Sequence, residues 1–138
     1  MTFKISAAAL AASFVCVASA SAIAQEPKVT PVVTKQLADI PGKDLLVLTV
    51  EYAPGAADSP HRHNADALVY VLEGSVIEQV KGGKPDTLTA GQTFYERPQD
   101  IHIVGRNAST TQPAKLLAIL VKKRGAPPLV PVKASQTP

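Results

Sequence analysis

Cysteine, tryptophan and histidine are scarce in this chain of 138 residues, which contains one, none and three of them respectively. The single cysteine, Cys16, lies in an apolar N-terminal run, so a domain that starts beyond this run cannot form an internal disulfide and must depend on its packed core. The same scarcity excludes a cysteine nucleophile and thiol redox chemistry.

Charge of one sign is also scarce, which argues against nucleic acid as a partner. The chain has 14 basic and 11 acidic side chains, and loss of Lys4 with the N-terminal run lowers the net charge from +3 to about +2. The one basic cluster, residues 122–124, has no aromatic side chains beside it on which a single strand could stack. We interpret this cluster as a solvated strand end.

The N-terminal residues have the composition of an export signal. Lys4 precedes an Ala-rich apolar run over residues 5–17, and small residues follow up to Ala24. This order predicts a signal peptide over residues 1–24, cleaved near Ala24–Gln25, and a periplasmic or secreted protein without a stable membrane anchor. A retained anchor is the alternative, but serines interrupt the run and alanine partitions weakly into lipid.

No amphipathic helical stretch of useful length follows; instead, short runs of Val, Leu, Ile and Thr are separated by Gly and Pro. This pattern predicts an all-β sandwich or barrel, because no helix is available to connect parallel strands. Turn residues such as Glu73-Gly74 and Gly82-Gly83 separate the runs, and we expect the strands to pair in sequence. The expected strands are Thr30–Leu37, Lys43–Ala53, Asp66–Leu72, Ser75–Lys81, Pro85–Thr89, Gln92–Glu96, His102–Asn107 and Ala114–Lys122.

The mature chain is long enough for one domain with one core. We assign residues 25–124 to a barrel domain. From Gly125 onward, prolines and small polar residues predominate, which predicts a Pro-rich disordered or extended tail over residues 125–138.

The histidines carry the main chemical signal. His61 and His63 are two residues apart, and on a strand this spacing places both imidazoles on one face, about 7 Å apart along the backbone. Neutral imidazole is the commonest protein metal ligand near neutral pH. A lone histidine is more often a surface or hydrogen-bonded core residue, so the pair by itself indicates a metal site only moderately.

The surroundings of the histidines resemble the two motifs of the cupin superfamily, specifically of its small single-domain members. The residues kept at the family's spacings are Gly55, His61, His63 and Gly74 in the first motif and Gly91, His102 and Asn107 in the second. The resemblance covers roughly residues 45 to 121. It implies a double-stranded β-helix, or jelly-roll barrel, in which His61, His63 and His102 face inward and bind one divalent metal ion.

Two departures from the family pattern change the expected site. Ala67 stands where the first motif has its glutamate, so the usual carboxylate ligand is missing and the resemblance implies a site of three histidines. In the second motif Arg97 and Gln99 replace the expected proline and glycine, so we expect an altered turn, with Pro98 shifted by one position.

A metal ion with three neutral ligands keeps its full charge and attracts anionic substrates or hydroxide. Imidazole suits Fe²⁺, Zn²⁺, Cu²⁺ and Ni²⁺ and serves Mn²⁺ less well, so the identity of the ion stays open among these. Exchangeable positions for water, substrate or O₂ favour a catalytic site over a structural one.

Glu96, six residues before His102, is the candidate for a fourth ligand or an acid/base group, with an exposed or hydrogen-bonded strand end as the alternative. Tyr95 and Tyr70 could donate to a bound oxyanion or occupy ordinary positions in the core or at the rim. Asp66 has the opposite strand parity from the histidine pair and is expected to face away. We therefore take Glu96 and Tyr95 as candidate catalytic residues.

Three functional hypotheses remain open after the resemblance. The first is a metal-dependent enzyme, dioxygenase-like or an isomerase or lyase, acting on a small oxygen-rich substrate. The second is a non-catalytic module that binds a small ligand, and the third is a metal-free structural cupin. The resemblance also implies a homodimer, to which an exposed strand over Thr30–Leu37 would contribute.

Overall fold

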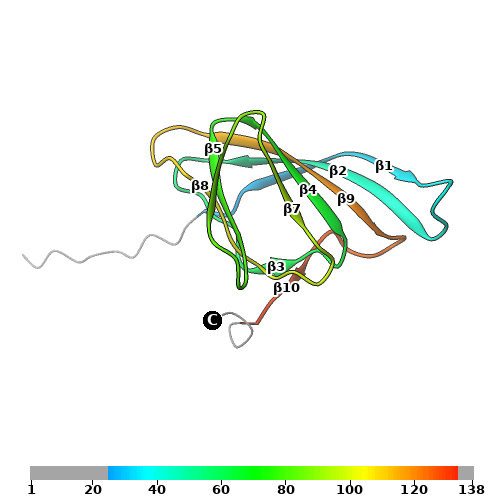
Figure 1. Ribbon diagram of the computed structural model, residues 1–138. Coiled ribbons are helices and arrows are strands. Elements are labelled where there is room, and N and C mark those ends of the chain that lie inside the picture. The colour runs from blue at the N-terminus through cyan, green and yellow to red at the C-terminus, as the bar shows by residue number, and fades with distance from the viewer. Residues whose placement is uncertain (1–24, 134–138) are drawn as a thin grey trace, which may run out of the picture.

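Apolar and polar side chains alternate along the longer strands, and this alternation builds two sheets that face each other. The computed structural model describes residues 25–133, which form an all-β barrel with antiparallel strand pairs, as the sequence predicts (Figure 1). The strands are β1 (Lys28–Gln36), β2 (Lys43–Tyr52), β3 (His61–Arg62), β4 (Asp66–Glu73), β5 (Ser75–Val80), β6 (Asp86–Thr89), β7 (Thr93–Glu96), β8 (His102–Asn107), β9 (Ala114–Lys123) and β10 (Val130–Pro131).

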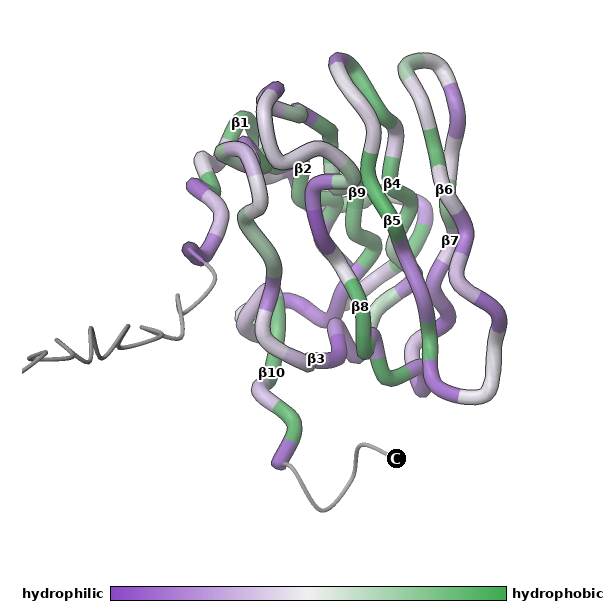
Figure 2. The backbone as a smooth tube through the Cα atoms, turned by 90° about the vertical axis from the view of Figure 1, so that its left-hand side faces the viewer, coloured by the Kyte–Doolittle hydropathy of each residue, from purple (hydrophilic) through white to green (hydrophobic). Residues whose placement is uncertain are grey.

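The two sheets have five strands each and enclose the core between them. The first has the order β1-β2-β9-β4-β7, and the second has the order β10-β3-β8-β5-β6. Inward-facing residues of β2 and β9 are buried, whereas most of their outward-facing residues are half-buried. Figure 2 shows hydrophobic residues along β4, β5 and β9 and hydrophilic residues in several connecting turns.

Within residues 25–133, no helix is long and apolar enough to span a membrane.

All eight predicted strands are present, each within two residues of its expected bounds. The sequence does not predict β3 and β10, because each has two residues and neither lies in an apolar run. Pairing in sequence is confirmed for β1–β2 and β5–β6 and is wrong for the other described strands. For example, β4 pairs with β9 and β7, and β8 lies between β3 and β5.

The turn at Gly74 sends the chain from the first sheet to the second instead of forming a hairpin. Gly74 has a φ of 71°, in the left-handed region that favours glycine. A Cβ at this position would lie 2.5 Å from the carbonyl oxygen of Pro113, in the segment that leads into β9. The backbones of the two segments therefore approach too closely for any other residue, and β5 continues in the opposite sheet.

The C-terminal segment over residues 125–133 follows the surface of the barrel, and residues 130–131 form a short strand, which agrees with the extended alternative of the predicted tail. β10 pairs with β3, and the N–H of Val132 donates to the carbonyl oxygen of Pro60 at 3.1 Å. Proline lacks an N–H and is tolerated at a sheet edge, which is the position that β10 occupies. Residues 134–138 of the predicted tail, and the predicted signal peptide, lie outside the described residues.

The basic cluster at the end of β9 also differs from the solvated strand end that the sequence suggests. Strand parity turns Lys122 inward, where its ammonium donates to the carbonyl oxygen of Ala126 at 2.8 Å and lies 3.9 Å from Asp44 Oδ2. Nε of Arg124 lies 3.7 Å from the other oxygen of Asp44. This buried carboxylate therefore fastens the start of the C-terminal segment to β2.

Candidate metal centre

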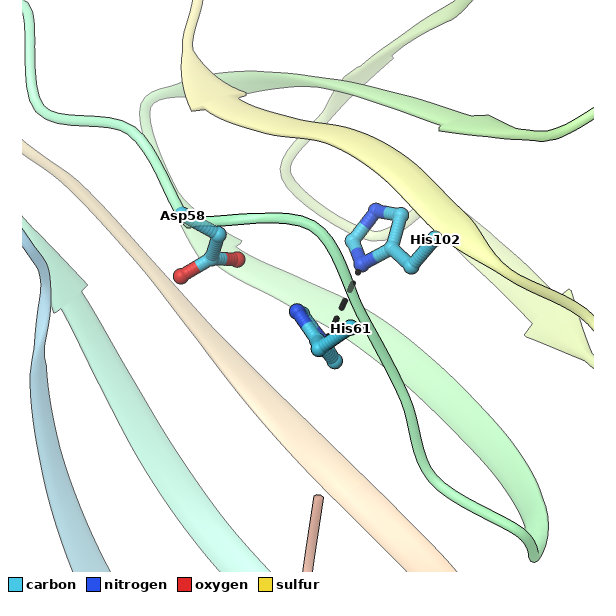
Figure 3. A group of neighbouring side chains, drawn as sticks. All are labelled: Asp58, His61 and His102. Carbon is cyan, nitrogen blue, oxygen red and sulfur yellow. Dashed lines mark hydrogen bonds between the residues drawn. The ribbon is translucent and has the colours of Figure 1, made fainter. Parts of the chain in front are cut away.

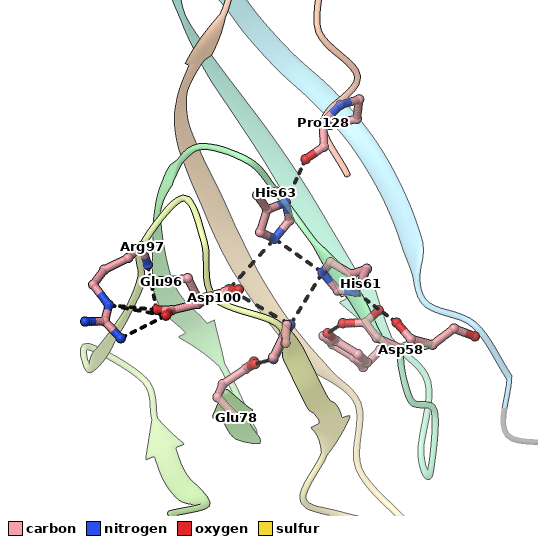
Figure 4. A network of polar contacts seen from close by, with 11 residues as sticks. Asp58, His61, His63, Glu78, Glu96, Arg97, Asp100 and Pro128 are labelled. Atoms are coloured by element: carbon pink, nitrogen blue, oxygen red, sulfur yellow. Dashed lines mark hydrogen bonds and ion pairs between the residues drawn. The ribbon is translucent and has the colours of Figure 1, made fainter. Parts of the chain in front are cut away.

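The three histidines come from neighbouring strands of the second sheet. His61 lies in β3 and His102 at the start of β8, where the two are register partners, and His63 follows β3 directly. The Nε2 atoms of His61 and His63 are 3.3 Å apart, and Nδ1 of His102 lies 3.4 Å from Nε2 of His61 (Figure 4). The structure thus brings together all three histidines that the sequence singles out.

Hydrogen bonds to the backbone assign the proton on two of the rings. The Nδ1–H of His61 donates to the carbonyl oxygen of Ser59 at 2.9 Å. The Nδ1–H of His63 donates to the carbonyl oxygen of Pro128 at 2.7 Å (Figure 4). Because a neutral imidazole carries one proton, Nε2 of each ring is left with a free lone pair.

Glu78 holds the third ring in the opposite tautomer. Its Oε2 lies 2.6 Å from Nε2 of His102, an ion-pair contact outside regular hydrogen-bond geometry, and this contact favours a proton on that nitrogen and leaves Nδ1 facing His61. A carboxylate behind a histidine is the usual arrangement around metal ligands, where it orients the ring and raises its basicity. Glu78 is not among the residues predicted from the sequence, although its inward parity with Val76 in β5 is a detectable signal.

Two pairs of ring nitrogens therefore lie close together, and Nε2 of His61 belongs to both pairs. Lone pairs this close repel each other unless a proton or a metal ion lies between them. A tetrahedral ion with ligands at about 2.1 Å separates its ligand atoms by about 3.4 Å. The separations of 3.3 Å between His61 and His63 and of 3.4 Å between His61 and His102 equal this ligand spacing.

Glu96 adds a carboxylate at the same point. It is the register partner of Ala67 across the β4–β7 pair and is 2% exposed. Its Oε1 lies 3.8 Å from Nε2 of His63 and 3.9 Å from Nδ1 of His102. Neither oxygen of Glu96 receives a hydrogen bond from residues 25–133. Burying a carboxylate without donors is costly, and a cation held with the histidines would remove that cost.

Asp58 lies on the other side of the histidines. Ligand atoms of Asp58, His61 and His102 are within 4.8 Å of one another, so this His/Asp group could hold a metal ion (Figure 3). The hydroxyl of Tyr52 donates to Asp58 Oδ2 at 2.5 Å. Asp58 therefore has a hydrogen-bond donor within the structure, whereas Glu96 has none among the described residues.

Gly105 leaves the space that this arrangement needs. A Cβ on Gly105 would lie 2.6 Å from Oδ2 of Asp58 and 2.7 Å from Cε1 of His102. The backbone N–H of Asp58 also donates to the carbonyl oxygen of Gly105 at 2.7 Å. Asp58 and Tyr52 are not among the residues predicted from the sequence. Asp58 lies in a loop without periodicity, and Tyr52 differs from other strand-end tyrosines only by its inward parity.

Tyr95 does not reach the centre, contrary to its prediction as a catalytic residue. Alternation in β7 turns Phe94 and Glu96 inward and leaves Tyr95 53% exposed on the outside. There its hydroxyl donates to Asp66 Oδ1 at 2.5 Å, so Asp66 faces away from the centre as predicted. Tyr70 is 39% exposed and also faces outward.

The turn before His102 is closed by side chains that the family motif does not use. The N–H of Arg97 donates to Asp100 Oδ2 at 2.8 Å, and the N–H of Asp100 donates to the carbonyl oxygen of Arg97 at 3.0 Å. Pro98 occupies the second position of this turn, which proline favours. Asp100 therefore helps to form the turn in the absence of the proline and glycine expected at positions 97 and 99.

Burial and neighbouring charges shift the pKa values of the centre in different directions. Burial lowers the pKa of His63 to about 4 and also lowers the pKa of His61. Burial raises the pKa of Glu96 to about 7. Burial acts to lower the pKa of His102, but the hydrogen bond with Glu78 and the charge of Glu96 raise it to about 9. Without a metal, a proton on His102 therefore supplies the positive charge that a metal ion would replace.

The centre opens into a cavity of about 260 Å³ between the two sheets. Beyond Asp58, Glu78, Glu96 and the histidines, its lining consists of Val29, Leu48, Val50, Tyr52, Val69, Leu116, Ala118, Pro128 and Leu129. The site therefore has ligand groups on one side and mainly apolar side chains on the other.

Comparison with known proteins agrees with this geometry. The family model of the cupin domain matches residues 48–120, which is more than half of the chain. No curated protein matches the sequence.

Solved structures with the same fold cover most of the described residues. A conserved protein with a double-stranded beta-helix domain from Klebsiella pneumoniae has a TM-score of 0.62 and 16% identity, and the match covers 78% of this chain and 85% of the other. A cupin domain from Bordetella pertussis has a TM-score of 0.57 and 20% identity, with 72% and 97% covered. The DMSP lyase DddQ from Ruegeria pomeroyi has a TM-score of 0.57 and 19% identity, with 64% of this chain and 43% of the lyase covered.

Proposed function

We propose that this chain, which belongs to the cupin domain family, binds one divalent metal ion through its three histidines and Glu96. With this ion it acts as a metal-dependent enzyme on a small substrate with oxygen donors. The observation that carries the proposal is the close approach of ring nitrogens of His63 and His102 to Nε2 of His61, next to a buried carboxylate without hydrogen-bond donors among residues 25–133. A metal ion bound among these groups would stabilise them together, and a proton on His102 supplies the positive charge when the metal is absent.

In this proposal, Glu96 supplies the carboxylate that Ala67 lacks. The two residues are register partners, so the methyl group of Ala67 leaves space for the Glu96 side chain on the inner face. A centre with three imidazoles and one carboxylate leaves a dication with a net charge of +1, and this donor set suits Zn²⁺, Fe²⁺, Ni²⁺, Cu²⁺ or Mn²⁺. When bound, such an ion polarises an oxygen of the substrate.

Asp58 and Tyr52 favour proton-transfer chemistry. Their hydrogen-bonded pair lines the cavity beside the histidines. Burial raises the pKa of Asp58 and also that of Tyr52, so Asp58 can hold a proton that an exposed carboxyl would lose. A carboxyl group that gives and takes a proton is what an isomerase or lyase needs, and we prefer these classes to a dioxygenase-like reaction.

A non-catalytic ligand-binding module is the second candidate. The cavity wall favours this candidate, because Tyr52 is the only polar side chain of the lining outside the metal centre. Asp58→Asn separates the two candidates: an enzyme loses turnover while keeping its metal and ligand affinity, and a binding module changes in neither respect. Oxygen-electrode assays with diketones, flavonols and phenolic acids, repeated without O₂ while product is followed, distinguish oxygenase from isomerase or lyase activity.

Elemental analysis of the purified mature protein tests the metal site. We expect about one dication per chain, and we expect His63→Ala to abolish retention, because His63 supplies one of the converging nitrogens. Tyr95→Phe is the matched control, since Tyr95 lies outside the barrel, and it should retain the metal. Equal metal content in wild type and His63→Ala would contradict the proposal.

Export to the periplasm or medium is part of the same proposal. The residues just after the expected cleavage point already contact the barrel, since the carbonyl oxygen of Gln25 accepts a hydrogen bond from the N–H of Ala57 at 3.0 Å, and Glu26 accepts one from the hydroxyl of Ser59. Cleavage after Ala24 would therefore leave the domain whole. N-terminal sequencing of the protein from the periplasmic fraction should begin at Gln25; an uncleaved cytoplasmic chain would contradict export.

A further inference from the structure

We propose that the ligand of the cavity is a small molecule with one oxygen-bearing end, which faces the metal ligands, and an otherwise apolar body of about the size of one ring. This inference rests on the proposed metal site and adds the chemical class of its ligand. It narrows the oxygen-rich substrate that the sequence suggests, because a sugar-like molecule does not match the wall described next.

The wall opposite the metal ligands is apolar. It is built by inward-facing side chains of the first sheet, from β2, β4 and β9, chiefly Leu48, Val50, Val69, Leu116 and Ala118. All five are at most 8% exposed. A ligand that enters the cavity therefore places one end on the metal ligands and its remaining surface on hydrocarbon.

Polar groups on the body of a ligand would find few partners. Among the side chains of β2, β4 and β9 that line the cavity, Tyr52 is the only polar one, and its hydroxyl already donates to Asp58. A hydroxyl pressed against this wall would lose its hydrogen bonds to water without replacement. The wall thus selects against sugars and other polyhydroxylated molecules.

The size of the cavity limits the body to about one ring or a short branched chain. The cavity measures about 260 Å³, whereas an apolar cavity of about 150 Å³ is sufficient for benzene. Apolar side chains continue to the rim, where Val29 of β1 is 48% exposed and Leu129 of the C-terminal segment is 40% exposed. The apolar lining therefore extends from the metal centre to the surface.

Three hydroxamates with the same chelating end test this assignment on the metal-loaded protein. Acetohydroxamate has a methyl body, benzohydroxamate a phenyl ring, and gluconohydroxamate a polyhydroxylated chain. By isothermal titration we expect benzohydroxamate to bind at least tenfold more tightly than acetohydroxamate, and gluconohydroxamate to bind no more tightly than acetohydroxamate. Equal affinities, or tightest binding of gluconohydroxamate, would overturn the ligand class.

Val69→Thr places a hydroxyl on the wall at nearly constant volume and should reduce the advantage of benzohydroxamate several-fold, leaving acetohydroxamate and metal content unchanged. Val71→Thr is the matched control: Val71 is buried on the same face of β4 but does not line the cavity, so the preference should persist. If both variants keep the full preference, the wall does not select the ligand.

Failure of the metal site would be distinguishable from failure of the ligand class. If the protein retains no metal, the proposed function fails, and toluene binding to the metal-free protein becomes the test of the apolar wall. Saturable toluene binding that Val69→Thr weakens would support the apolar class; no binding would overturn it.

Discussion

At the scale of single residues, Glu96 combines deep burial with the lack of any hydrogen-bond donor among the described residues. Its charge is therefore unfavourable in the metal-free protein and favourable once a cation is bound. Burial raises the pKa of Glu96 from 4.5 to about 7, which reflects the free-energy cost of ionising this carboxyl inside the barrel. Removal of this carboxylate should thus have opposite effects on the free energy of unfolding with and without metal.

Glu96→Gln should stabilise the chelator-treated protein at pH 8. Because the folded-state pKa lies above the unfolded value, the carboxyl contributes stability below pH 4.5 and loses this contribution as the pH rises through about 7. The loss across this window is on the order of 3 kcal/mol at 1.36 kcal/mol per pKa unit. Urea unfolding of wild type and Glu96→Gln at pH 4 and pH 8 measures this loss of stability. Addition of Zn²⁺ at pH 8 should make wild type the more stable of the two proteins. Parallel pH profiles would contradict an unpaired buried carboxylate.

Gly105 sets the distance between Asp58 and His102. In Gly105→Ala the new methyl group would displace the carboxylate or the ring, so we expect metal affinity to fall about tenfold to a hundredfold, as when an outer-shell partner is lost. In Gly83→Ala the Cβ would have its nearest neighbour at 3.2 Å, outside the site, and this matched control should bind metal normally. Competition with a chromogenic chelator gives both affinities; equal values would show that the site adapts.

At the scale of elements, the C-terminal segment completes the site. The carbonyl oxygen of Pro128 fixes the tautomer of His63, and Leu129 lines the cavity. Deletion of residues 128–138 removes both contacts and keeps Ala126, which binds Lys122. We expect a folded barrel with metal affinity lowered about tenfold or more. Deletion of residues 134–138 alone is the control and should leave the affinity unchanged; equal losses in both would point to a different cause.

The strands and the histidine cluster were accessible to sequence reasoning for a physical reason. Alternation and glycine turns act locally, and the histidines follow a spaced motif that fixes which of them converge. Strand pairing depends on contacts between residues far apart in the sequence. No local pattern predicts that β4 pairs with β9 or that Glu78 lies beside His102. β10 escapes prediction because its partner β3 has two residues and its own prolines suggest a loop.

The alternation of side chains along β7 also explains why Glu96 lines the cavity whereas Tyr95, its neighbour, does not. Glu96 and Tyr95 are adjacent in sequence, so one had to face inward and the other outward. The sequence alone does not decide which, because both can lie at a barrel rim. The small Ala67 opposite position 96 is the feature that gives the inward side to Glu96.

At the scale of the whole molecule, metal binding and folding should be linked. The domain has no disulfide to constrain its unfolded state, so a ligand of the folded state has a direct effect on its melting temperature. At a free metal concentration of about 100 Kd, the added stability is about 2.7 kcal/mol, which for a domain of this size raises Tm by several degrees. Calorimetry with and without metal should show this rise for wild type and none for His63→Ala; a rise in both would locate the metal elsewhere.

The pairing of Ala67 with Glu96 has a consequence for how relatives of this chain are recognised. In the proposed site the carboxylate comes from β7, opposite the small Ala67 of β4. An alignment that scores each column separately would count the carboxylate as lost in such a chain. Scoring the two columns jointly, as a pair that needs one acid and one small residue, would recover members whose metal centre has moved from one strand to its neighbour.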